Sequence, residues 1–101
     1  MASWVKAAKR QDIPPGNGVV ADCAGTSVAL FNVDGEFFAT QNKCPHRGGP
    51  LGEGELNGGV VTCPWHAWSF DVRNGINVDN PNSKLLCYPV KLESDDVLVE
   101  V

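Results

Sequence analysis

The sequence predicts an all-β fold, and three features of the 101-residue chain point to it. No segment carries the hydrophobic period of a helix. Short runs rich in Val, Phe, Leu and Thr alternate with clusters of Gly, Asn, Asp and Pro, as strands alternate with turns. Asp34-Gly35 between FNV and EFFAT is a strong hairpin signal, because a type I′ turn needs positive φ at both central residues.

The first half of the chain should form a short strand and two hairpins. A turn is expected at Ile13-Pro14-Pro15-Gly16, and Ala24-Gly25-Thr26 should join the first hairpin. The expected strands are residues 4–6, 19–23, 27–33 and 36–40. A loop over residues 43–51 follows, in which two prolines and two glycines exclude regular structure.

The second half should contain shorter strands joined by polar turns. Asn57-Gly58, Asn74-Gly75 and Ser94-Asp95-Asp96 are the expected turns, and residues 77–83 form a polar loop. The expected strands are residues 55–56, 59–62, 68–72, 84–90 and 97–101. No repeat or linker divides the chain, so we expect one domain over residues 1–101.

Composition narrows the class of protein. With 43% hydrophobic and 20% charged residues the chain is globular, and its small core would benefit from a metal staple. A net charge of −4 argues against nucleic-acid binding and favours partners with basic surfaces. No apolar run approaches the about 20 residues of a membrane span, and no secretory signal opens the chain. We therefore expect a cytoplasmic protein without a membrane partner.

Four cysteines and two histidines supply candidate metal ligands. They read Cys44-x-His46, sixteen intervening residues, then Cys63-x-x-His66. Two thiolates and two imidazoles can hold a tetrahedral zinc ion or an iron–sulfur centre, and the spacing alone does not choose. The other two cysteines, at positions 23 and 87, lie in apolar runs and are expected to be small buried hydrophobes; a disulfide between them is the alternative.

The residues around these ligands resemble the Rieske [2Fe-2S] family. CPHRGGPL and CPWHAWSFD match its two cluster-binding boxes. The resemblance implies that Cys44 and Cys63 hold one iron of a [2Fe-2S] cluster and that His46 and His66 hold the other. It also implies an antiparallel β-sandwich base with a small inserted cluster-binding lobe, here about residues 43–75.

Four further positions favour a low-potential, ferredoxin-like branch of that family. In the high-potential branch, a serine and a tyrosine donate hydroxyls to the cluster, and Trp68 and Phe70 stand there in this chain. That branch also has a bracing disulfide, whose positions match Gly49 and Trp65. Trp65 is expected either to cover the cluster or to fill the core.

The resemblance implies an electron-transfer protein that is not itself an enzyme. It would be a monomer when isolated and would carry one electron from a flavoprotein reductase to a terminal oxygenase. One alternative is the Rieske-like small subunit of an NAD(P)H nitrite reductase, and a second is a redox-inert structural zinc module. The chain cannot be an oxygenase, because no histidine remains for the mononuclear iron that this chemistry needs.

Overall fold

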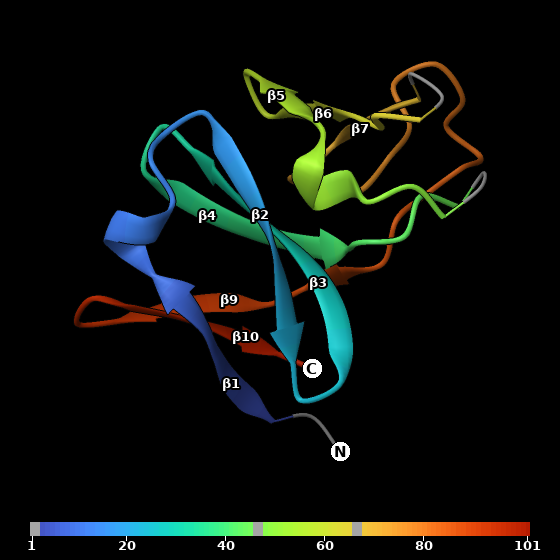
Figure 1. Ribbon diagram of the computed structural model, residues 1–101. Coiled ribbons are helices and arrows are strands. Elements are labelled where there is room, and N and C mark those ends of the chain that lie inside the picture. The colour runs from blue at the N-terminus through green and yellow to red at the C-terminus, as the bar shows by residue number, and fades with distance from the viewer. Residues whose placement is uncertain (1–2, 46–47, 66–67) are drawn as a thin grey trace.

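The computed structural model describes residues 3–45, 48–65 and 68–101, and these ranges are almost entirely β structure (Figure 1). Helical turns are limited in this part of the chain to the 3-10 segments η1 (Arg10–Asp12) and η2 (Leu51–Glu53). The strands are β1 (Trp4–Lys9), β2 (Asn17–Cys23), β3 (Thr26–Val33), β4 (Glu36–Gln41), β5 (Glu55–Asn57), β6 (Val60–Thr62), β7 (Ser69–Asp71), β8 (Cys87–Tyr88), β9 (Val90–Glu93) and β10 (Asp96–Glu100). The all-β prediction is confirmed.

The strands form three antiparallel sheets. Their orders are β1-β10-β9, β2-β3-β4-β8 and β5-β6-β7. The first two sheets make the sandwich base, and the third lies beyond the β2-β3-β4-β8 sheet, at the top of the molecule in Figure 1. The predicted base with a smaller inserted sheet is therefore confirmed.

Strand β3 is central because both of its faces are buried. Side chains alternate along a strand, so successive residues point to opposite sheet faces. Val28 and Leu30 pack in one core with Val97 and Val99 of β10. The intervening positions belong to a second core, shared with the third sheet: Ala29, Phe31 and Val33. This alternation explains why the β1-β10-β9 sheet and the third sheet pack against opposite faces of β3.

The turn chemistry of the first half follows the sequence. Asp34 and Gly35 have φ of 52° and 95°, which confirms the predicted type I′ hairpin. Ala24 and Gly25 also have positive φ, 53° and 87°, and form the whole two-residue turn between β2 and β3. Positive φ for alanine is uncommon; here the Asp22 carboxylate accepts a hydrogen bond from the Gly25 amide at 2.8 Å.

Several predicted element boundaries were wrong. Strand β1 runs to Lys9, not to residue 6, because its partner β10 continues alongside it through a register shift. The predicted strand over residues 84–90 is instead β8 followed by β9, separated at Pro89, which has no amide hydrogen for a ladder bond. At this proline the chain passes from one sheet of the sandwich to the other.

Other departures are smaller. The β5–β6 turn is centred on Gly58 and Gly59, with φ of 58° and 92°, one residue later than predicted. The β9–β10 turn is Ser94-Asp95, so Asp96 already belongs to β10. In the described part of the chain, no helix is long and apolar enough to cross a membrane.

Candidate metal centre

The first ligand loop, residues 43–51, is closed by a ladder of hydrogen bonds at its neck. The Asn42 carbonyl accepts from the Leu51 amide at 2.8 Å, and the Asn42 side-chain oxygen accepts from Gly52 at 2.9 Å. Further into the loop, the Cys44 amide donates to the Gly49 carbonyl at 2.9 Å, and the Gly48 amide donates to the Cys44 carbonyl at 2.7 Å. Cys44 is thus fixed inside a compact turn at the end of β4.

The second ligand loop, residues 63–68, connects β6 to β7. The Cys63 amide donates to the Trp68 carbonyl at 2.7 Å, which closes the loop on itself. Below it, the hydroxyls of Thr62 and Ser69 lie 3.0 Å apart as cross-strand neighbours. The loop is therefore the connection of a hairpin, and the hairpin sets the position of Cys63.

The two loops bring Cys44 and Cys63 into one buried region. Their exposed fractions are 2% and 1%, and both belong to the core shared by β3 and the third sheet. A Cβ placed on Gly49 of the first loop would lie 2.7 Å from Sγ of Cys63. Neither cysteine is in a disulfide. Two soft thiol donors from separate loops are suited to a sulfur-preferring metal centre.

The imidazole half of the predicted ligand set cannot be placed. His46 and His66 lie outside the described residues, as do their neighbours Arg47 and Ala67. Within the ranges that the structure describes, no group of three or more His, Cys, Asp or Glu side chains forms another candidate metal site. The structure thus describes only Cys44 and Cys63 of the predicted ligand set, and the assignment of all four ligands stays a prediction.

The three aromatic residues of the second loop and β7 occupy different environments. Trp65 is 59% exposed, so the expectation that it fills the core is wrong. Its ring lies beside Gly49, with Cγ 3.1 Å from the position of an added Cβ. Phe70 is fully buried, and its ring centroid lies 6.4 Å from that of half-buried Trp68. Neither Trp68 nor Phe70 carries a hydroxyl that could donate to a bound sulfide.

A third loop, residues 77–83, lies against the second. Asn77 is 5% exposed, and its side-chain oxygen accepts from the amides of Asp79 at 2.8 Å and Asn80 at 3.1 Å. The Val78 amide donates to the Ser69 carbonyl of β7 at 3.0 Å. Trp68, Asn77, Asp79 and Asn80 enclose a cavity of about 200 Å³. The predicted polar loop is therefore anchored to β7 and lies beside Trp68 of the second ligand loop, and Pro81 within it is exposed.

Two supporting residues were missed by sequence reasoning. Gln41, at the end of β4, donates from Nε2 to the Lys43 carbonyl at 2.7 Å and accepts at Oε1 from the Leu86 amide at 2.8 Å. Arg73 places its guanidinium carbon 5.8 Å from the Phe38 ring centroid and contacts Gly59. Both join the ligand-bearing segments to the base. Nothing in the sequence distinguishes them from surface polar residues.

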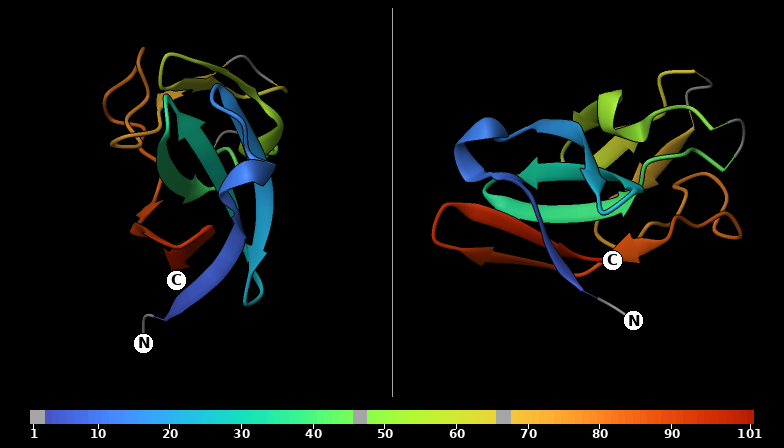
Figure 2. Two further views of the ribbon diagram at one scale, coloured as in Figure 1. Left: turned by 90° about the vertical axis from the view of Figure 1, so that its left-hand side faces the viewer. Right: turned by 60° about the horizontal axis from the view of Figure 1, so that its bottom comes forward.

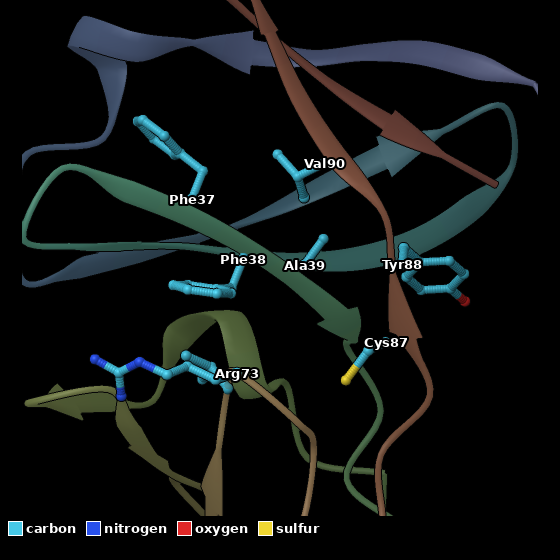
Figure 3. Close-up of a pocket in the computed structure, with 8 residues that line it drawn as sticks. Phe37, Phe38, Ala39, Arg73, Cys87, Tyr88 and Val90 are labelled. Atoms are coloured by element: carbon cyan, nitrogen blue, oxygen red, sulfur yellow. The ribbon is translucent and has the colours of Figure 1, made fainter.

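A second cavity, of about 210 Å³, lies where β8 and β9 diverge from β4 (Figure 3). Phe37, Phe38, Tyr88 and Val90 form most of its walls, with Arg73 beneath Phe38 and Cys87 projecting from β8. It is the gap that the chain leaves on crossing between the two base sheets. It contains neither of the ligand cysteines and is separate from the metal centre.

The remaining cysteines are thiols, so no Cys23–Cys87 bridge forms. Cys23 is fully buried, as predicted, whereas Cys87 is only half-buried. Burial raises the pKa of the Cys23 thiol, and the Asp22 carboxylate adds to this rise. The pKa of Cys87 is also raised, mainly by burial. The charge of Lys84 opposes this rise, and the charge of Asp71 adds to it. Neither thiol is activated as a nucleophile or a metal ligand.

The fold and the two thiol-bearing loops define a small β protein that holds a metal centre between two hairpin-anchored loops. The family model described as "Rieske [2Fe-2S] domain" matches residues 3–89. The chain belongs to this family and carries a [2Fe-2S] domain. The residues fit the cluster, because two soft thiol donors from different loops are buried in the same core.

Named relatives fall into two groups. The biphenyl dioxygenase ferredoxin subunit of Pseudomonas sp. (strain KKS102) is 42% identical over 100 residues, covering 97% of this chain and 92% of the relative. A solved complex of reduced oxygenase and oxidized ferredoxin in carbazole 1,9a-dioxygenase contains a chain with TM-score 0.87 and 31% identity, covering 95% of this chain and 91% of that one. The solved structure of a putative NADH-dependent nitrite reductase small subunit from Mycobacterium tuberculosis has a TM-score of 0.91 and 26% identity. The match covers 100% of this chain and 96% of that one.

Proposed function

We propose that this chain is the ferredoxin component of an aromatic-ring dioxygenase system. It takes one electron from a flavoprotein reductase and delivers it to a terminal oxygenase. The observation that carries this proposal is the 42% identity, over nearly the whole chain, to a ferredoxin subunit of such a system. The chain acts as a carrier, and its partners perform the catalysis.

We assign the cluster ligands as Cys44 and Cys63 on one iron and His46 and His66 on the other. When bound, the cluster supplies a site for one reversible electron, and two neutral imidazoles in place of thiolates make that electron easier to accept than in plant-type ferredoxins. The protein's own part is to keep both thiols buried and to hold the two loops at the ends of their hairpins. Residues 1–101 act as one domain, with the ligand lobe at about residues 43–75.

We place the carrier in the cytoplasm, as a monomer when isolated. Support comes from Cys23 and Cys87, the two cysteines outside the ligand set, which remain thiols as expected in a reducing compartment. A permanent subunit of a nitrite reductase is the second candidate, favoured by the TM-score of 0.91 to a small subunit of that kind. Gel filtration of a native extract separates the two, since comigration with a large flavoprotein would favour the subunit.

The deciding experiment is EPR of dithionite-reduced protein with iron, sulfide and zinc analysis. A rhombic Rieske signal with two irons per chain supports the proposal. Colourless protein with one zinc per chain would establish the structural zinc module instead. Turnover with the reductase and oxygenase components of the Pseudomonas biphenyl dioxygenase then tests the carrier role.

Single substitutions test the ligand assignment. Replacing Cys63 or His66 by alanine should abolish the signal, because either change leaves an iron one ligand short. Cys23→Ser is the matched control, since Cys23 lies in the other core and should leave the signal intact. A full signal from Cys63→Ala would contradict the assignment.

A further inference from the structure

The exposed indole of Trp65 is an unusual feature beside a buried metal site. Large apolar side chains at the surface of the described chain are few, and Trp65, at 59%, is among the most exposed of them. Its ring packs against Gly49, whose missing side chain also lets Cys63 Sγ approach. The indole therefore lies at the junction of the two ligand loops, next to one of the thiols.

Charges are distributed unevenly along the sequence around this junction. Residues 43–84, which run from the first ligand loop to the residue after the third loop, are formally neutral. They contain four cations and four anions: Lys43, Arg47, Arg73, Lys84, Glu53, Glu55, Asp71 and Asp79. The rest of the chain contains four cations and eight anions, and so carries the whole net charge of −4.

Much of that negative charge lies at the far end of the base. Asp12 is on η1, Asp34 on the β3–β4 turn and Asp95 on the β9–β10 turn. The Arg10 amide donates to the Asp95 carbonyl at 2.8 Å, so η1 adjoins the last turn. These segments are at the left of Figure 1, opposite the ligand loops, and the right-hand view of Figure 2 shows the same separation. The molecule is 36 Å long and the Debye length at physiological ionic strength is about 8 Å, so salt then screens the acidic end from a partner at the loops.

We propose that Trp65 is the anchor of the electron-transfer contact, and that the matching partner surface is an apolar, nearly uncharged recess beside the partner's redox centre. This inference rests on the proposed carrier function and names the kind of partner that it fits. Tryptophan, with tyrosine and arginine, is enriched among the few residues that dominate binding at the centre of protein interfaces. A neutral face adds little charge steering, so the encounter should depend weakly on salt.

The whole-chain charge favours a different contact, with a basic partner surface. That expectation assumes that the partner senses all twelve acidic residues. Because the excess anions lie outside residues 43–84, a partner at the ligand loops meets balanced charge and an exposed indole. The Trp65 contact predicts a weak response to salt and a large effect of losing Trp65, whereas the basic-surface contact predicts a strong response to salt and a small effect of losing Trp65.

Electron transfer from the reduced protein to the oxygenase component of the Pseudomonas biphenyl dioxygenase tests the contact with a redox partner. The carrier loses one electron and the oxygenase gains it, so the reaction is balanced, and stopped-flow absorbance gives its second-order rate constant. We expect Trp65→Ala to slow this transfer about fivefold or more, as for loss of a contact worth roughly 1 kcal/mol. Trp4→Ala is the matched control: Trp4 is 40% exposed on β1, and its loss should leave the rate unchanged.

Ionic strength and the midpoint potential complete the test. Between about 0.1 M and 1 M salt we expect less than about a threefold change in rate, whereas attraction of the whole-chain charge of −4 to a basic partner surface should give a fall of about tenfold or more. Trp65→Ala should keep the wild-type midpoint potential. If the alanine variant binds too little cluster, Trp65→Gln, which keeps more of the side-chain volume, is the second variant.

The outcomes separate this inference from the proposed function. Protein without a Rieske signal would remove the carrier function itself. Cluster-containing Trp65 variants with the wild-type rate, or a steep fall of the rate with salt, would overturn only the Trp65 contact. A slower rate accompanied by a changed potential would also overturn it, because Trp65 would then act on the cluster rather than on the encounter.

Discussion

The position of a Cβ on Gly49 lies 2.7 Å from Sγ of Cys63 and 3.1 Å from Cγ of Trp65. The two ligand loops therefore touch through a position that has no side chain. Gly49 is not in the left-handed region, so the need for glycine here is one of space. The same contact explains how two positions distant in sequence, 49 and 65, can be adjacent, as the resemblance to disulfide-braced relatives implied.

Gly49→Ala should reduce cluster loading to a small fraction of the wild-type level, because the methyl group would displace Cys63 or Trp65. Iron per chain and visible absorbance measure the loading. Gly25→Ala is the matched control, because Gly25 has φ of 87° with open space around it. This substitution should lower the free energy of unfolding by about 1 kcal/mol and leave the amount of bound cluster unchanged. Full loading of Gly49→Ala would show that the loops can separate freely.

The buried ring of Phe70 gives a test of redox tuning. Phe70→Tyr should raise the midpoint potential, because a hydroxyl donor favours the extra negative charge of the reduced state. A hydrogen bond to a charged group is worth roughly 1.5 to 3 kcal/mol, which for one electron is at most about 65 to 130 mV. Redox titration followed by EPR measures it. The control is Phe37→Tyr in the base; a lower or unchanged potential for Phe70→Tyr would argue against the hydroxyl explanation.

Arg73 should stabilise the attachment of the third sheet to the base. Its guanidinium lies over the Phe38 ring, while the ion pair with Asp71 is 4.0 Å long and half-exposed, so the ring contact is the larger contribution. Arg73→Ala should lower the free energy of unfolding by about 1 kcal/mol, and Arg73→Lys should recover only part of it. Urea titration measures both, with exposed Arg10→Ala as the control. Equal losses for Arg73→Ala and Arg10→Ala would exclude the ring contact.

The parts of the fold that local chemistry determines could be predicted. Asp34-Gly35 specifies its own turn, and the β3 run SVALFNV is apolar enough to be a strand in any context. Strand β1 and the break at Pro89 were misplaced because they depend on which distant strand each residue pairs with. The pattern KAAK favours no strand alone, yet Ala8 and Lys9 pair with Val97 and Asp96.

In the candidate site, too, features set by local sequence could be predicted and features set by distant partners could not. Cys44 and Cys63 could be proposed as ligands because their motifs are local; the structure buries both, and their role as ligands stays a prediction. The roles of Gln41 and Arg73 could not, since each depends on a hydrogen bond or ring contact with a residue far along the chain, Leu86 for one and Phe38 for the other. Trp65 could be either core or surface until the two loops were placed against each other.

The buried thiol of Cys23 should make the protein less stable in alkali. Burial, aided by Asp22, raises the pKa of Cys23 in the folded state above its ordinary value of 9.0. Its contribution to stability is therefore complete below about pH 9 and is lost as the pH rises toward the folded pKa, because the unfolded chain releases the proton first. Urea unfolding between pH 7.5 and about pH 10.5 should show the free energy falling with pH.

Cys23→Ala should flatten that fall, whatever it costs in packing at neutral pH, because the titrating group is gone. Cys87→Ala is the matched control: its pKa is also raised by burial and by Asp71, but Lys84 opposes the shift and the side chain is only half-buried, so it should flatten the curve less. If the two variants keep the wild-type slope, the alkaline loss arises from other groups; if Cys87→Ala flattens it more, the thiol that matters is the one on β8.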